Sequence, residues 1–70
     1  MGEVDLVIGQ RIRQRRQELG FSRHDLAETI GVAEEILEKV EGGERRAGGH
    51  LLSKIAPALG VTIAFFFEHG

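Results

Sequence analysis

The stretch from Ser22 to Glu41, SRHDLAETIGVAEEILEKVE, decides the fold of this chain. Ser22 precedes Asp25 by three residues, a close relative of the S/T-x-x-E capping box, so we expect a helix to begin at Arg23. Gly31 can end this helix because glycine tolerates a positive φ. The apolar residues of the helix lie four apart, at Leu26 and Ile30. The sequence therefore predicts a short amphipathic helix that ends in a tight turn.

A second short helix is expected directly after the turn, from about Ala33 to Glu41. The pair Gly42-Gly43 ends it. Its inward-facing residues are Ile36, Leu37 and Val40. Two short helices joined by a glycine-containing turn are the signature of a helix-turn-helix, here at about residues 22–41.

The length and composition of the chain limit what it can be. Seventy residues make one small domain at most, so we expect a single domain over residues 1–70. There is no cysteine, which excludes a disulfide framework and a thiolate metal site. No apolar run approaches the roughly 20 residues of a membrane span, and no signal peptide is evident. We therefore expect a cytoplasmic protein without membrane contact.

The whole pattern resembles the lambda-repressor-like domains of the Xre/Cro type, over roughly residues 8–67. The resemblance implies a compact all-α fold of five helices. Matching residues occur in every expected helix: Arg11, Ile12, Arg13, Arg16, Gly20, Phe21, Ser22, Leu26, Ala27, Glu28, Gly31, Val32, Leu37, Glu41, Gly43, Arg45, Leu52, Ile55, Ala56, Leu59, Gly60, Val61 and the phenylalanines at 65–67.

The last two expected helices follow the glycine-rich loop. One begins near His50, and Pro57 inside its apolar pattern predicts a bend or an early end near Ala56. A short fifth helix is expected over Ile63–Glu68.

The first helix, from about Leu6 to Glu18 with Asp5 as a possible cap, carries an unusual inward arginine. Its inward stripe is Ile8, Ile12, Arg16 and Leu19. A buried arginine needs a partner, and Glu41 lies on or near the inward face of the second motif helix. We expect Arg16 and Glu41 to form an ion pair, and the resemblance implies the same pair. The alternative is that both side chains extend to solvent.

The charges of the chain are unevenly distributed around a net charge of −2. Residues 1–23 carry five arginines against three acids, whereas residues 24–41 carry six acids against one lysine. On composition alone each run is a solvated helix face, and the net negative charge disfavours a nucleic-acid partner.

The resemblance gives these charges roles. It implies a sequence-specific transcriptional regulator whose second motif helix lies in the major groove of double-stranded DNA. The residues it implies at base edges are Glu34, Glu35, Glu38 and Lys39. The residues it implies at phosphates are Arg11, Arg23, Arg45 and Arg46; from the residues alone, the last two belong to an ordinary charged loop.

The base-facing set departs from the family pattern, which mostly has Gln, Ser, Thr, Arg or Lys there. Three glutamates repel phosphates, although glutamate can accept a hydrogen bond from cytosine N4. Ala33 also stands where the family usually has a capping Ser or Thr, which is worth about 1 kcal/mol. A second interpretation therefore stays open: a protein-interaction module, such as an antitoxin-like or accessory subunit, that kept the fold and lost base reading.

The residues indicate no enzyme, cofactor or small-molecule substrate. Ser22 and Ser53 have no recognisable base and acid partners for catalysis. The glycines match neither a P-loop nor a dinucleotide-binding fingerprint. No metal-ligand spacing is present among His24, His50 and His69.

The phenylalanines at 65–67 predict association. A helix turns about 100° per residue, so three consecutive aromatic residues cannot all face one small core. Ile63 and Phe66 form a stripe of their own, and the resemblance implies that Phe65 enters the core while Phe66 lies near a two-fold interface. We expect a homodimer through the fifth helix, built on Ile63 and Phe66. The alternative is a monomer whose patch folds back on the first helix or is covered by further chain.

Overall fold

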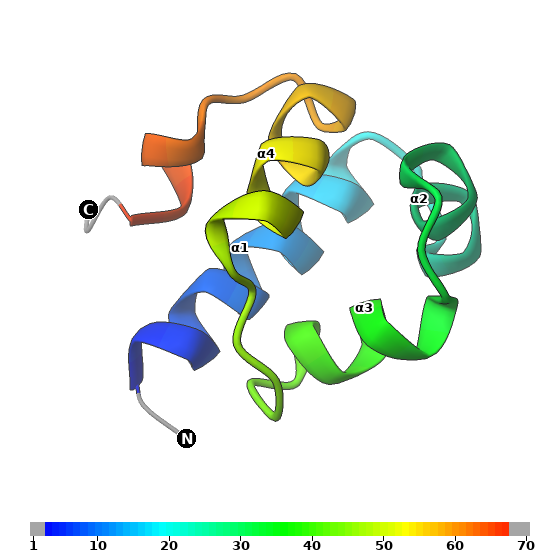
Figure 1. Ribbon diagram of the computed structural model, residues 1–70. Coiled ribbons are helices and arrows are strands. Elements are labelled where there is room, and N and C mark those ends of the chain that lie inside the picture. The colour runs from blue at the N-terminus through cyan, green and yellow to red at the C-terminus, as the bar shows by residue number, and fades with distance from the viewer. Residues whose placement is uncertain (1–2, 68–70) are drawn as a thin grey trace.

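The computed structural model describes residues 3–67, which form four α-helices and a closing 3-10 helix (Figure 1). The elements are α1 (Glu3–Glu18), α2 (Arg23–Ile30), α3 (Glu34–Glu41), α4 (Gly49–Ala58) and η1 (Ile63–Phe67). This range contains no strand, so the predicted all-α class is confirmed. The expected fifth α-helix is instead a short 3-10 helix, a form that proteins use in short pieces. Its expected end at Glu68 lies outside the described residues.

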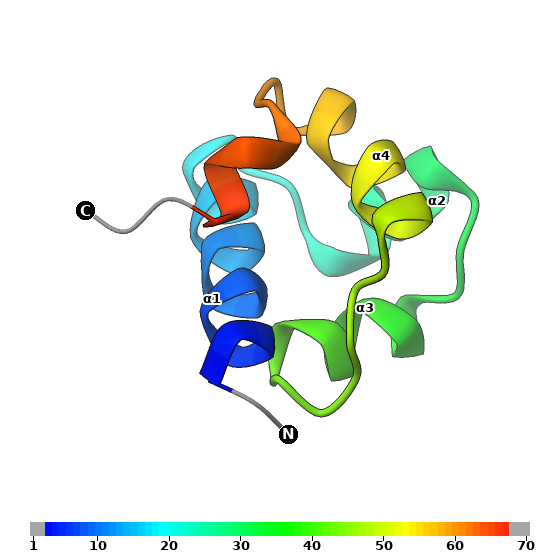
Figure 2. The same ribbon diagram turned by 60° about the vertical axis from the view of Figure 1, so that its left-hand side comes forward.

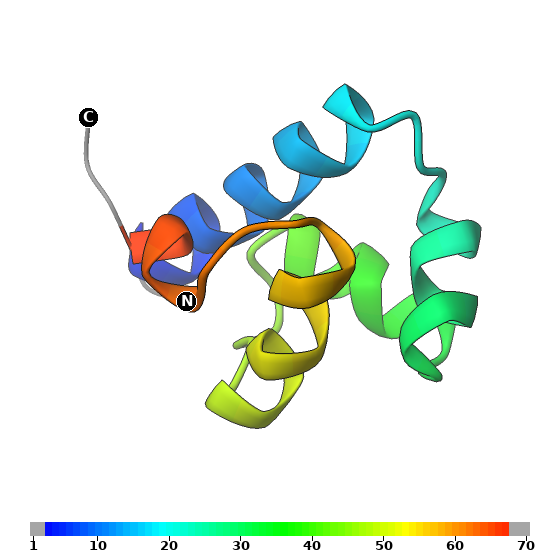
Figure 3. The same ribbon diagram turned by 90° about the horizontal axis from the view of Figure 1, so that it is seen from above.

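The five elements close into a ring around one core. Helix α1 contacts α3 and η1, α2 contacts α3 and α4, and α4 contacts η1 (Figure 2). Seen from above, α2 and η1 lie at opposite ends of the molecule (Figure 3). None of the helices in residues 3–67 has the length and apolar character that crossing a bilayer requires.

The core is built from apolar side chains of every element and of the loop before α4. Its buried members are Ile8, Ile12, Leu26, Ala27, Leu37, Val40, Ala47, Leu52, Ile55, Ala56, Leu59 and Phe66. Leu19, expected on the inward stripe of the first helix, is instead 44% exposed. It lies just beyond the end of α1 and beside Gly20, whose φ of 76° turns the chain away.

Two predicted helix boundaries are wrong. Helix α1 begins at Glu3, so Asp5 lies inside the helix and is buried rather than acting as its cap. Helix α4 continues through Pro57 and ends at Ala58. Pro57 has no N–H to donate to the carbonyl of Ser53, so α4 lacks one internal hydrogen bond there and extends only one residue further.

Gly9, in the middle of α1, allows α3 to approach closely. A Cβ added at Gly9 would overlap the carbonyl oxygen of Val40 and lie 2.9 Å from that of Glu41. Glycine inside a helix costs about 1 kcal/mol relative to alanine, so a glycine here has a packing reason. No local sequence pattern indicates this role of Gly9, because it depends on how the two helices cross.

Candidate nucleic-acid interface

The N-terminus of α2 is held by its own side chains. The backbone N–H of Asp25 donates to Oγ of Ser22 at 3.0 Å, and the backbone N–H of Ser22 donates to Oδ2 of Asp25 at 3.3 Å. This is the reciprocal capping box. The predicted start of the helix at Arg23 is confirmed.

The turn between α2 and α3 depends on Gly31. Gly31 has φ 74° and ψ 36°, in the left-handed region, and its N–H and that of Val32 donate to the carbonyl of Ala27. After this turn Ala33 precedes α3 in an extended conformation and makes no side-chain cap. The predicted turn at Gly31 and the missing cap at Ala33 are both confirmed.

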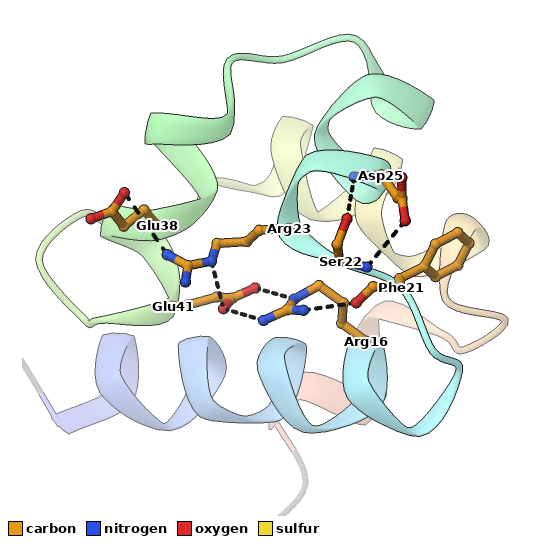
Figure 4. A network of polar contacts seen from close by, with 7 residues as sticks. All are labelled: Arg16, Phe21, Ser22, Arg23, Asp25, Glu38 and Glu41. Atoms are coloured by element: carbon orange, nitrogen blue, oxygen red, sulfur yellow. Dashed lines mark hydrogen bonds and ion pairs between the residues drawn. The ribbon is translucent and has the colours of Figure 1, made fainter.

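Arg16 and Glu41 form a buried, bidentate ion pair between α1 and α3 (Figure 4). Nε of Arg16 donates to Oε2 of Glu41 at 2.8 Å, and its second nitrogen donates to Oε1 at 3.0 Å. The remaining guanidinium nitrogen donates to the carbonyl of Phe21 at 2.7 Å. The pair expected from the two inward stripes is therefore present. It fixes the C-terminal end of α3 to α1 and to the loop before α2.

Arg23 extends this network from the core to the surface of α3. Its guanidinium lies 3.7 Å from Oε1 of Glu41 and 3.9 Å from Oε2 of Glu38 (Figure 4). The side chain of Arg23 is 38% exposed. The guanidinium of Arg23 therefore lies at the edge of the exposed surface of α3, where solvent can reach it.

The base-facing candidates share one property, which is that all of them are exposed on α3: Glu34, Glu35, Glu38 and Lys39. Leu37 and Val40 on the other side of the helix are buried in the core. The exposed positions of the helix are therefore all charged, while its position is fixed by the core and by the Glu41 ion pair.

The structure brings only part of the predicted phosphate-binding set to this surface. Arg23 lies beside α3, and exposed Arg45 follows α3 directly, its backbone N–H donating to the carbonyl of Lys39 at 3.3 Å. Arg11 points elsewhere, with its Cζ 6.0 Å from the ring centre of Phe65 in η1. Nε of Arg46 lies 3.5 Å from Oδ1 of Asp5, at the start of α1.

The expected dimer patch is wrong in one residue. Phe66 is the residue of η1 that enters the core, with no exposed surface, and it packs edge to face on Phe65. Since η1 contacts both α1 and α4, one aromatic side chain fills the space beneath it, and burying a whole phenylalanine stabilises the fold by about 1.5–3 kcal/mol. Ile63 is 40% and Phe67 48% exposed, so these two are the large apolar side chains that η1 exposes, with Ala64 between them also exposed.

Two short helices joined through a left-handed glycine, with the second helix exposed along its polar face, define a helix-turn-helix domain. The helix-turn-helix family model matches residues 12–66, and the chain belongs to this family. The resemblance to lambda-repressor-like domains drawn from the sequence is thereby confirmed.

Proteins similar in sequence to this chain are named as transcriptional regulators. An uncharacterized HTH-type transcriptional regulator of Sinorhizobium medicae is 40% identical over 65 residues, which are 93% of this chain and 47% of the relative. The chain thus spans about half the length of this relative.

Two solved structures share the fold. The restriction-modification controller protein C.AhdI from Aeromonas hydrophila superposes with a TM-score of 0.86 at 30% identity, over 90% of this chain and 96% of that one. SinR, a master regulator for biofilm formation solved in complex with DNA, superposes with a TM-score of 0.83 at 35% identity, over 87% of this chain and 98% of that one.

Proposed function

We propose that this chain is the DNA-binding module of a transcriptional regulator and that α3 docks in the major groove of double-stranded DNA. The main support for the proposal is that α3 is exposed on its polar side and held in a fixed position. Its polar side is exposed along the whole helix, while the turn at Gly31 and the Arg16–Glu41 pair hold it at a fixed angle. The major groove of B-DNA admits one α-helix. The similarity to SinR, which was solved with DNA, supports the same role.

Two arginines are suited to contact the phosphates on either side of such a groove. Arg23 begins α2 beside α3, and Arg45 lies just past the end of α3. Arg11 and Arg46, proposed for the same role from the family resemblance, lie away from α3, beside Phe65 of η1 and Asp5 near the start of α1. We therefore propose that Arg23 and Arg45 supply most of the phosphate contacts and that the other two contribute less.

The salt dependence of binding tests this assignment. Each phosphate contact that is lost lowers the slope of log K against log salt concentration by roughly one, equally on all sequences. Arg23→Ala and Arg45→Ala should each show this change on random-sequence duplex DNA. Lys54→Ala is the charge-matched control, because Lys54 is exposed on α4, away from its core-facing residues. An unchanged slope in both arginine variants would refute the assignment.

We also propose that two copies of the chain associate through η1, as a regulator with a two-half-site operator requires. Exposed Ile63 and Phe67 would form the contact, with Phe67 in place of the buried Phe66. Phe67 also lines an apolar groove of about 510 Å³ with Val4 and Ile8, which a second copy could fill. Sedimentation should find a dimeric parent and a folded, monomeric Phe67→Asp variant. A parent that stays monomeric at high micromolar concentration rules this association out.

A further inference from the structure

The exposed charges of α3 fall on two different sides of the helix. Glu34 and Glu38 lie four apart and, with the buried Glu41 that follows them at helical spacing, form a flank. Glu35 and Lys39 lie about 100° further round, on the side away from the buried Leu37 and Val40. The second pair therefore projects furthest from the body of the domain.

Nitrogen-bearing side chains of α2 meet the flank. Nδ1 of His24 lies 3.5 Å from Oε1 of Glu34, and the guanidinium of Arg23 lies 3.9 Å from Glu38 and 3.7 Å from Glu41. The flank thus faces α2, and its carboxylates are drawn toward that helix.

The outward pair has no such partners. Among residues 3–67, neither Glu35 nor Lys39 forms an ion pair with another side chain. The two residues are also four apart on one face, where Cβ atoms are separated by roughly 5–6 Å. One acceptor and one donor therefore stand next to each other on the side of α3 that faces away from the core.

The major-groove edge of a G·C pair matches this arrangement. Cytosine presents the N4 amino group as a donor, which a carboxylate accepts, and guanine presents O6 and N7 as acceptors, to which lysine donates. Successive base pairs are about 3.4 Å apart, so side chains at this spacing reach the same pair or adjacent pairs.

We propose that Glu35 and Lys39 are the specificity-determining residues of α3, and that they read cytosine and guanine in one G·C pair or two neighbouring ones. Glu34 and Glu38 face α2 and contribute no base reading. This inference rests on the proposed function, because it assumes that α3 enters the major groove.

The test is a selection from a library of random-sequence DNA duplexes with the full chain and four single variants. Glu35→Gln should lose the preference for cytosine at one position by roughly 5- to 150-fold, the worth of one good base contact. Lys39→Met should lose the preference for guanine at the same or the next position. Glu34→Gln and Glu38→Gln are the matched controls, and they should tighten binding to all duplexes while leaving the sequence profile unchanged.

Two kinds of failure are distinguishable. A parent that prefers G·C pairs, with Glu35→Gln retaining the cytosine preference or Glu34→Gln losing it, overturns this inference and leaves DNA binding intact. A parent that binds duplexes without any sequence preference also overturns this inference and leaves DNA binding intact. A parent that binds no duplex at low salt overturns the proposed function and this inference with it. All four positions are exposed, and unchanged melting temperatures show that the variants are folded.

Discussion

The two helices of the motif have the same length, eight residues, but are held in opposite ways. The N-terminus of α2 is fixed by the capping box of Ser22 and Asp25, within four residues of sequence. The N-terminus of α3 has no side-chain cap, and this helix is fixed at its far end by Glu41 and by the close approach to Gly9. The sequence around α2 thus specifies that helix locally, whereas the position of α3, the helix proposed to meet DNA, depends on tertiary contacts.

The largest effect should come from removing the anchor of α3. Glu41→Ala leaves Arg16 buried without its carboxylate, and breaking a buried ion pair from one side typically costs about 3–5 kcal/mol. Urea unfolding measures the change in free energy. Glu44→Ala, in the exposed loop beyond α3, is the control and should change stability by less than about 0.5 kcal/mol. Equal losses for the two variants would contradict the role of Glu41.

The next effect concerns the contact between α1 and α3. In Gly9→Ala the new methyl group collides with backbone carbonyls of α3, which cannot move aside as a flexible side chain can. Overpacking of this kind costs about 1–3 kcal/mol. Gly49→Ala, where an added Cβ meets nothing within 4 Å, should leave the melting temperature nearly unchanged. If both variants melt together with the parent, the close approach does not hold α3.

A smaller loss is expected at the capped helix. Ser22→Ala removes the acceptor for the Asp25 N–H and should destabilise the domain by about 1 kcal/mol. Thermal unfolding monitored by circular dichroism measures it. A variant as stable as the parent would mean that α2 is held by packing, as α3 is.

The smallest effect should be a gain at the uncapped helix. Ala33 already has the extended conformation of a cap residue, φ −70° and ψ 140°. Ala33→Ser should therefore supply the missing acceptor and raise stability by about 0.5–1 kcal/mol. No gain in unfolding free energy would show that the start of α3 cannot use a cap, and the contrast between the two helices would then have another cause.

The parts of the fold that could be predicted from the sequence are those with short-range signals. Ser22, Gly31 and the pair Gly42-Gly43 set the ends of α2 and α3, and the structure has these ends where they were expected. The Arg16–Glu41 contact joins distant parts of the chain, but opposite charges on two inward stripes revealed it. These signals predict the structure correctly because tertiary packing stabilises the same helix ends and the same side-chain contact.

The parts that could not be predicted depend on three-dimensional placement. Consecutive phenylalanines have no period, so the sequence could not tell that Phe66 rather than Phe65 is fully buried. The sequence predicted a cap role for Asp5, because its partner, Arg46, is far along the chain and could not be foreseen. The family resemblance implied that Arg11 contacts phosphate. Its contact with Phe65 depends on where η1 packs, which the sequence does not show.

The most direct test of the central claim, that α3 is presented for docking on DNA, is a salt titration of the parent chain with random-sequence duplex DNA. We expect measurable binding at low salt and a steep negative slope of log K against log salt concentration, because arginines beside α3 displace counterions from phosphates. No binding to any duplex at low salt would contradict it. That result would favour a protein-interaction module that has the helix-turn-helix fold and an acidic α3.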